Sequence, residues 1–186
     1  METQIHLTER TEKQEKEKIL IKMMNDFMIN NQYSKIIRYY GNVNSKIFIL
    51  GEAPVSVHLN STSKCVFAFD DESYDKKGRS GEVILKVFSD LNVKISDYFF
   101  DNAFKIPTED LTEDEIQVHI DLLIKEINIV SPNKIICLGN DVFNIVKDLN
   151  LDYNIVKLQH PAYIIRNNYT NYAEYLEAWR KELKWT

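Results

Sequence analysis

Cysteine, glycine and proline are scarce in this chain of 186 residues, which contains two Cys, five Gly and four Pro. Two isolated cysteines, Cys65 and Cys137, are too few for a disulfide framework or for a metal site made of cysteine alone. So little glycine and proline excludes a low-complexity chain. We therefore predict a folded protein of the reducing cytoplasm, with no metal and no cofactor.

Long apolar runs are also missing, and none approaches the roughly 20 residues that a membrane-spanning helix requires. The first residues, METQIHLTERTEKQEKEK, are polar and mixed in charge, which is not the pattern of a secretory signal. The hydrophobic fraction of 44% and the length suit one domain with its own core. We expect a single monomeric domain over residues 1–186 with no membrane contact, and residues 1–41 as a helical extension packed on it.

A strong charge of one sign is absent as well. The net charge is −5, which argues mildly against a nucleic-acid partner, but residues 109–126 alone carry seven acids and one lysine. Without that acidic segment, 22 basic and 21 acidic residues remain. An enzyme that binds DNA at one site needs only a small basic patch, so charge neither indicates nor excludes DNA.

What is present is an alternation of short apolar runs with amphipathic stretches. The runs predict four buried strands, at residues 45–50, 97–102, 133–139 and 153–158. The amphipathic stretches predict helices at residues 8–40, 78–93, 111–130, 141–150 and 169–183. This order calls for an α/β fold, a three-layer α/β/α sandwich around a mostly parallel four-stranded sheet.

One helix start is unusually well marked. Thr112 is a predicted N-cap, Glu115 follows three residues on, and acids fill the first turn of the helix. By contrast, residues 161–167 after the fourth strand read as a loop.

Small or polar residues stand at the carboxyl end of every predicted strand. They are Gly51-Glu52-Ala53-Pro54, Asn102, Leu138-Gly139-Asn140 and His160-Pro161. In open α/β sheets, ligands bind in the crevice outside the carboxyl ends of the strands. We therefore predict that these four signals converge on one pocket.

Three side chains of this predicted pocket are candidates for catalysis or ligand binding. Glu52 suits a general base or a group that stabilises developing positive charge. Asn102 offers a donor and an acceptor to the edge of a planar heterocycle, and His160 suits a donor to an anionic leaving group or a proton shuttle. Each also has an ordinary structural explanation, as a turn acid, a strand-ending asparagine and a partly buried histidine.

Two further segments invite a similar choice. Residues 78–81, Gly-Arg-Ser-Gly, can present backbone N–H groups and the Arg79 cation to a phosphate, or can simply begin a helix with Ser80 as its cap. Ile164 and Ile165 can wedge into a base stack or can face the core.

Taken in order, the motifs ILGEAP, GRSGE, DNAFK, PNKIICLG and HPAYIIRN resemble the uracil-DNA glycosylase superfamily, over roughly residues 45–168. The nearest pattern is that of its thermostable, iron–sulfur-bearing branch. That branch has a Gly-Glu-x-Pro-Gly loop, a Gly-Arg-Ala-Gly helix start, a Thr-Asn-Val-Val-Lys-Cys strand end and a His-Pro-Ser-x-x-Leu-Arg loop.

The resemblance implies roles for the pocket residues. Glu52 would lie beside the sugar, positioning water or stabilising an oxocarbenium-like centre, and Ala53 would line the base pocket. Asn102 would read the Watson–Crick edge of a flipped base, and His160 would donate to the base O2.

The resemblance also implies contacts with the DNA strand. Arg79 and Ser80 would lie near a phosphate. Arg166 would hold the backbone, while Ile164 and Ile165 would fill the gap left by the flipped nucleotide.

The chain departs from the family pattern in the pocket wall. Val55 replaces the glycine after Pro54, and the phenylalanine that stacks on uracil in relatives has no counterpart at its place. Tyr74, Phe67 or Phe69 would have to supply the stacking face, and we assign Tyr74 and Phe69. The cluster cysteines are missing too, so we predict no iron–sulfur cluster.

These features predict a monofunctional DNA glycosylase that hydrolyses the N-glycosidic bond of a flipped uracil or modified pyrimidine and leaves an abasic site. One alternative is excision of a bulky modified cytosine from phage DNA, as an anti-phage defence. Another is a catalytically inactive DNA-binding scaffold of the same fold. No lysine stands in an obvious Schiff-base position, so strand cleavage is not expected. A nucleotide-handling enzyme is disfavoured because no phosphate-binding fingerprint is present.

Overall fold

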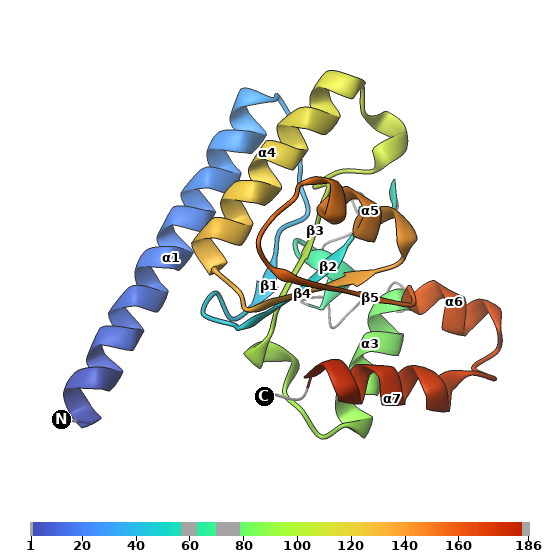
Figure 1. Cartoon of the computed structure of the whole chain (residues 1–186). Helices are drawn as coiled ribbons and strands as arrows, with labels where there is room; N and C mark the ends of the chain where they lie inside the picture. The colour runs from blue at the N-terminus through green and yellow to red at the C-terminus, as the bar shows by residue number, and fades with distance from the viewer. Residues whose placement is uncertain (1, 57–62, 70–78, 184–186) are drawn as a thin grey trace.

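A mostly parallel five-stranded sheet forms the centre of the computed structural model, which describes residues 2–56, 63–69 and 79–183 (Figure 1). The strand order is β1-β3-β2-β4-β5. Four strands run parallel: β2 (Ile47–Gly51), β3 (Phe99–Asn102), β4 (Lys134–Leu138) and β5 (Asn154–Leu158). All four were predicted from the sequence. The fifth, β1 (Tyr40–Gly41), pairs antiparallel with β3 at one edge, and its two residues are too few to carry a pattern.

The central strand is apolar because both of its faces are covered. Every residue of β2 is buried, and the run Ile-Phe-Ile-Leu-Gly has no polar alternation, as expected for a parallel strand between two helical layers. The outer strand β5 is only partly buried and carries Asn154 and Lys157 in its exposed positions. Burial therefore falls from the centre of the sheet to this edge.

Helices cover both faces of the sheet (Figure 1). One layer consists of α3 (Arg79–Asp90), α6 (Pro161–Arg166) and α7 (Tyr172–Leu183), which share a core with Ile49, Phe100 and Ile136. The other consists of α1 (Glu2–Asn30), α4 (Glu113–Val130) and α5 (Asn140–Asp148), around Phe48, Phe99 and Ile135. Alternate residues of each strand thus face opposite layers. The three-layer sandwich is confirmed.

The N-terminal helix ends earlier than predicted. α1 stops at Asn30 rather than near residue 40, and the segment after it is irregular. The second half of α1 packs on α4 through Leu20, Met24 and Phe27, all buried, while Figure 1 shows its first turns projecting beyond the end of α4. Within the described residues, no helix is both long and apolar enough to span a bilayer.

The first residues of α4 and α6 show how local hydrogen bonding and residue type set where a helix begins. At the start of α4 the predicted capping box is present: the Glu115 carboxylate accepts from the Thr112 N–H at 2.8 Å, and the Thr112 hydroxyl accepts from the Glu115 N–H. The loop predicted after β5 is wrong, because Pro161 to Arg166 form α6 with His160 as N-cap and Pro161 in its first turn. Proline is well suited to the first helical position, where its missing N–H costs nothing.

Candidate active site

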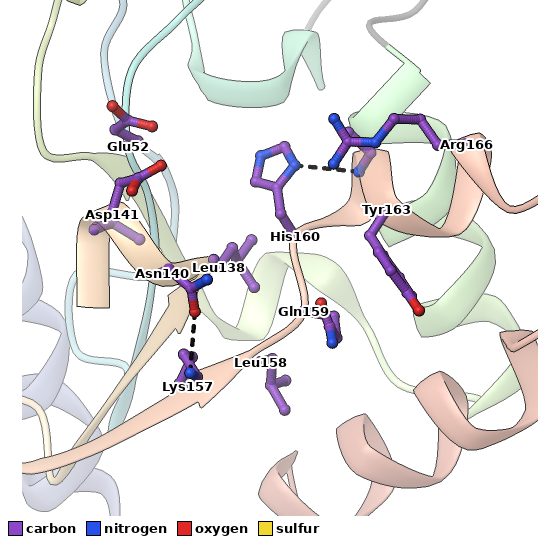
Figure 2. A pocket seen from close by; sticks show the side chains of 13 residues that line it. Glu52, Leu138, Asn140, Asp141, Lys157, Leu158, Gln159, His160, Tyr163 and Arg166 are labelled. Carbon is purple, nitrogen blue, oxygen red and sulfur yellow. Dashed lines mark hydrogen bonds between the residues drawn. The ribbon is translucent and has the colours of Figure 1, made fainter. Parts of the chain in front are cut away.

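The carboxyl ends of β2, β4 and β5 surround a cavity of about 630 Å³ (Figure 2). Its lining comes from the β2 loop, the β4–α5 turn, the end of β5 and α6. The side chains with chemical potential are Glu52, Asp141, Lys157, His160, Tyr163 and Arg166. The predicted convergence of strand-end residues thus holds for β2, β4 and β5.

Glu52 follows β2 at the cavity wall. Hydrogen bonds from the turn after β3 hold its backbone in place. The carbonyls of Gly51 and Glu52 accept from the N–H groups of Ala103 and Phe104, at 2.9 and 2.8 Å. Partial burial, then the negative charges of Asp141 and Glu109, raise the pKa of Glu52 above its ordinary value. A carboxylate so placed is a better proton acceptor near neutral pH than an exposed one.

His160 lies on the cavity wall at the N-terminus of α6. Its Nδ1 accepts a hydrogen bond from the Ala162 N–H at 3.2 Å (Figure 2). An accepting Nδ1 leaves the proton of the neutral imidazole on Nε2, which is then a donor. Burial, then the nearby Arg166 cation, lowers the pKa of His160 against the opposing effect of Asp141, so the ring is neutral at pH 7.

The β4–α5 turn next to the histidine has a backbone conformation that favours glycine. Gly139 has φ of +109°, and a Cβ there would lie 3.4 Å from the Cβ of His160. Its N–H donates to the Leu158 carbonyl at 2.9 Å, which joins the ends of β4 and β5. Any side chain at this position would be strained because of this φ, while a Cβ would make ordinary contact with His160.

Asn102 ends β3, one strand away from the cavity, and is not one of the described residues that line it. The residue is buried, with 4% of its surface exposed. A Cβ on Gly51 would overlap the Asn102 Oδ1 and would lie 3.1 Å from Cζ of Phe67. Gly51 therefore leaves room for the Asn102 amide beside an aromatic ring.

The Phe67 ring and that amide both lie next to Gly51. Its backbone and that of Ala68 have positive φ, 56° and 55°, a conformation that costs a bulky residue of order 1–3 kcal/mol. Phe69 packs against the rings of Tyr40 and Phe100, at 5.2 Å in each case, and the Phe67 ring contacts those of Phe69 and Phe100, at 5.5 and 6.4 Å. Tyr74 lies outside the described residues, so Phe67 joins Phe69 as a candidate for the stacking face.

The predicted DNA contacts divide into two groups. Arg166 lines the cavity, and Ile165 is half-buried on α6. Ile164 is only 1% exposed and belongs to the core, so it lies in the interior rather than on a surface that a duplex reaches. Arg79 is the first residue of α3 and Ser80 follows it, half-buried. Ala53 is half-buried and packs on the core around α4.

Sequence reasoning missed Asp141 and Lys157. Figure 2 shows the Asp141 carboxylate on the same side of the cavity as that of Glu52, and the Lys157 ammonium donates to the Asn140 Oδ1 at 3.0 Å. The signal for Asp141 was its place just beyond the strand-ending Gly139-Asn140. Lys157 belongs to a strand, and nothing in the sequence distinguishes it from other exposed strand residues.

The cysteines do not fit an iron–sulfur cluster. Such clusters are held by four thiolates as a rule, and the whole sequence contains two, Cys65 and Cys137. Both are buried, and burial raises the pKa of the Cys137 thiol to about 12. In the described part of the chain no group of three or more His, Cys, Asp or Glu side chains is placed to hold a metal ion.

Comparison with known families matches residues 38–184 to the uracil-DNA glycosylase superfamily. That match spans well over half of the chain, from the residues before β1 to the end of α7. The chain has the α/β fold of the uracil-DNA glycosylase superfamily and belongs to that superfamily.

Among solved structures, the fold is similar to that of SMUG2 from Pedobacter heparinus, with a TM-score of 0.51. The identity is 16%, and the alignment covers 73% of each chain, a likeness that concerns the fold. No curated protein matches the sequence.

Proposed function

We propose that this protein is a monofunctional DNA glycosylase that hydrolyses the N-glycosidic bond of a flipped uracil or modified pyrimidine. The observation that carries the proposal is that Glu52 and His160 line one cavity, with Asn102 at the end of the strand next to that of Glu52. A carboxylate and a neutral imidazole donor are the two groups that this hydrolysis requires. The protein acts as a monomer, in the cytoplasm.

The reaction follows from these two groups. The bond between C1′ and the base breaks, and its electron pair leaves with the base as an anion that the His160 Nε2–H stabilises at O2. The Glu52 carboxylate stabilises the positive charge left on the sugar. Water then adds to C1′ and gives its proton to Glu52, while the released base takes a proton from solvent. No lysine adduct is needed, so the strand stays intact.

Asn102 and Phe67 are proposed to select the base. The amide reads the Watson–Crick edge, and the Phe67 ring beside it supplies a stacking face. Arg166 is proposed to hold a phosphate of the flipped nucleotide, and Ile165, rather than the buried Ile164, to occupy the space that the nucleotide leaves.

A second candidate is excision of a bulky modified cytosine. The cavity volume of about 630 Å³ lies well inside the range of about 300–1,000 Å³ for pockets that take drug-sized ligands. Asn140, Asp141 and Gln159 line the cavity, and such side chains suit a hydroxylated substituent on the base. A role in defence against phage DNA goes with this substrate.

The test is release of free base from single- and double-stranded oligonucleotides that carry uracil, hypoxanthine, a thymine mismatch, or hydroxymethylated or glucosylated cytosine. We expect one class of base to be released, and Glu52→Gln or His160→Ala to slow release by about 100-fold or more. Glu177→Gln, at an exposed site on α7, is the matched control and should behave as wild type.

Two results would contradict the proposal. If no base is released while oligonucleotide binding persists, the protein is an inactive scaffold. If borohydride traps a covalent adduct or the strand is cut, the chemistry proceeds through an amine and not through water alone.

A further inference from the structure

A buried lysine contacts the backbone of Asn102. This residue, Lys105, lies three positions after Asn102 in the sequence, and the Lys105 side chain is 0% exposed. Burial alone lowers the pKa of Lys105, but Asp101 and Glu126 more than offset this and raise it above its ordinary value. The ammonium is therefore charged, in the interior, without touching the cavity.

Three oxygens lie close to the ammonium, two in ion pairs and one in a hydrogen bond. The Lys105 Nζ lies 2.8 Å from the Asp101 Oδ1 and 2.8 Å from the Glu126 Oε2. It donates a further bond of 2.8 Å to the Asn102 carbonyl. The same Asp101 Oδ1 accepts the Asn102 N–H at 2.7 Å. Both backbone polar groups of Asn102 are thus bound to one charged cluster.

The turn that carries this cluster also holds the Glu52 loop. Its Ala103 and Phe104 N–H groups donate to the Gly51 and Glu52 carbonyls, as described above. The Lys105 N–H donates to the His119 Nδ1 at 3.1 Å, and the Lys105 carbonyl accepts from the Ile37 N–H at 3.0 Å. Residues 101–105 are therefore connected to β2, to α4 and to the segment after α1.

A fold alone does not require such a cluster. Buried ion pairs are commonly matched or exceeded in stability by apolar residues of similar size. Such a pair contributes geometric specificity instead, because a charged ammonium between fixed oxygens restrains the backbone around it. Here the restrained residue is the one whose side chain is proposed to read the base.

We propose that Lys105, with Asp101 and Glu126, is a positioning residue that fixes Asn102 for base recognition. The proposal rests on the proposed function, since it assigns Asn102 to the base. Lys105 acts through Asn102 and has no contact with substrate.

The test is a double-mutant cycle. Lys105→Met alone leaves two buried acids without a cation and can prevent folding, so the variant used is Lys105→Met with Glu126→Leu. We expect kcat to fall by about 100-fold with KM within about threefold. In an Asn102→Ala background, the same pair of changes should lower kcat by less than about twofold further.

The matched control is another lysine–glutamate pair, Lys134 and Glu182, whose Nζ and Oε2 lie 3.2 Å apart at the opposite ends of the strands. Lys134→Met with Glu182→Leu should leave kcat unchanged. A folded Lys105 variant with wild-type kcat would overturn the proposal. So would an equal loss of about 100-fold in both backgrounds, which a general weakening of the fold would produce.

Hydrogen exchange separates this inference from the proposed function. If wild type releases no base from any oligonucleotide, the proposed function fails, but the exchange rate of the Asn102 amide still reports on Lys105. We expect the backbone N–H of Asn102 to exchange at least about tenfold faster in the Lys105 variant than in the Lys134 control. Equal rates in the two variants would overturn the positioning role.

Discussion

Asp141 lies on the same wall of the cavity as Glu52 (Figure 2) and acts on the two groups that the proposed reaction uses. Asp141 raises the pKa of Glu52 and also opposes the fall in the pKa of His160. Glu52 has to be ionised to accept a proton from water, and His160 has to be neutral for its Nδ1 to accept the Ala162 N–H and hold the ring in place. Activity should therefore fall at low pH as these groups become protonated.

Asp141→Asn should move the acidic limb of the pH–activity profile to lower pH. Without the negative charge, the pKa of Glu52 and that of His160 both fall, so the active protonation states persist in more acidic solution. The measurement is the single-turnover rate of base release across pH. Asp148→Asn, at an exposed site on the same helix, should leave the limb in place. A shift of the limb to higher pH would contradict the assignment of Glu52 as the base.

At the scale of elements, the close approach of β2 to β3 depends on a residue without a side chain. Gly51 pairs with Asn102 across these two strands, and a Cβ there would overlap the Asn102 Oδ1. The strands are held by the ladder and by the turn beyond them, so the amide is the group that has to move.

Gly51→Ala should lower kcat by about 100-fold, because a displacement of about 1 Å in a positioned group has that effect. It should also destabilise the fold by about 1–3 kcal/mol through overpacking. Combining it with Asn102→Ala removes the overlap and should restore most of the stability, measured by urea unfolding. If stability is not restored, the clash lies with Phe67 instead.

The elements also show what a sequence can predict. The strands were predicted because each is a buried apolar run, and the α4 capping box because two side chains three residues apart define it. β1 was missed because its pairing depends on β3, which is remote in sequence. α6 was missed because residues 161–167 were read as a loop, although the His160-Pro161 pair already indicates a helix start.

The part of the candidate site that local sequence patterns define was predicted. Glu52 and His160 follow strands directly, so strand direction alone brings them together. Lys105, Glu126 and Phe67 were not assigned, because their roles depend on which segments pack over the strand ends. A buried ion cluster between a turn and a helix leaves no periodic signal in a sequence.

At the scale of the whole molecule, His119 joins three parts of the fold. It lies on α4, accepts the Lys105 N–H, and its ring contacts those of Phe27 and Phe104, with centroids 4.9 and 5.9 Å apart. Burial, and then the Lys105 cation, lowers the pKa of His119 to about 4 from 6.5. Between about pH 4 and pH 6.5, His119 is therefore mostly neutral in the folded protein and mostly protonated in the unfolded chain.

The folded protein should therefore lose stability in mild acid. Because the folded pKa is the lower one, the contribution is complete above about pH 6.5 and declines as the pH falls toward about 4. The loss amounts to about 3 kcal/mol for a pKa difference of this size. The free energy of unfolding in urea, followed across this range, measures it. His119→Gln retains an acceptor without a charge and should show a smaller decline; an equal decline would assign the effect to other groups.

The order of the strands has a consequence for how the protein becomes active during synthesis. β2 is the central strand and the first of the parallel four, while β5 at the outer edge is the last. Glu52 and Asn102 leave the ribosome long before His160, which follows β5. A nascent or prematurely terminated chain thus contains Glu52 and Asn102 and lacks His160, so the cavity that the end of β5 and α6 help to line is incomplete. The cavity is therefore complete only after the last strand has joined the sheet.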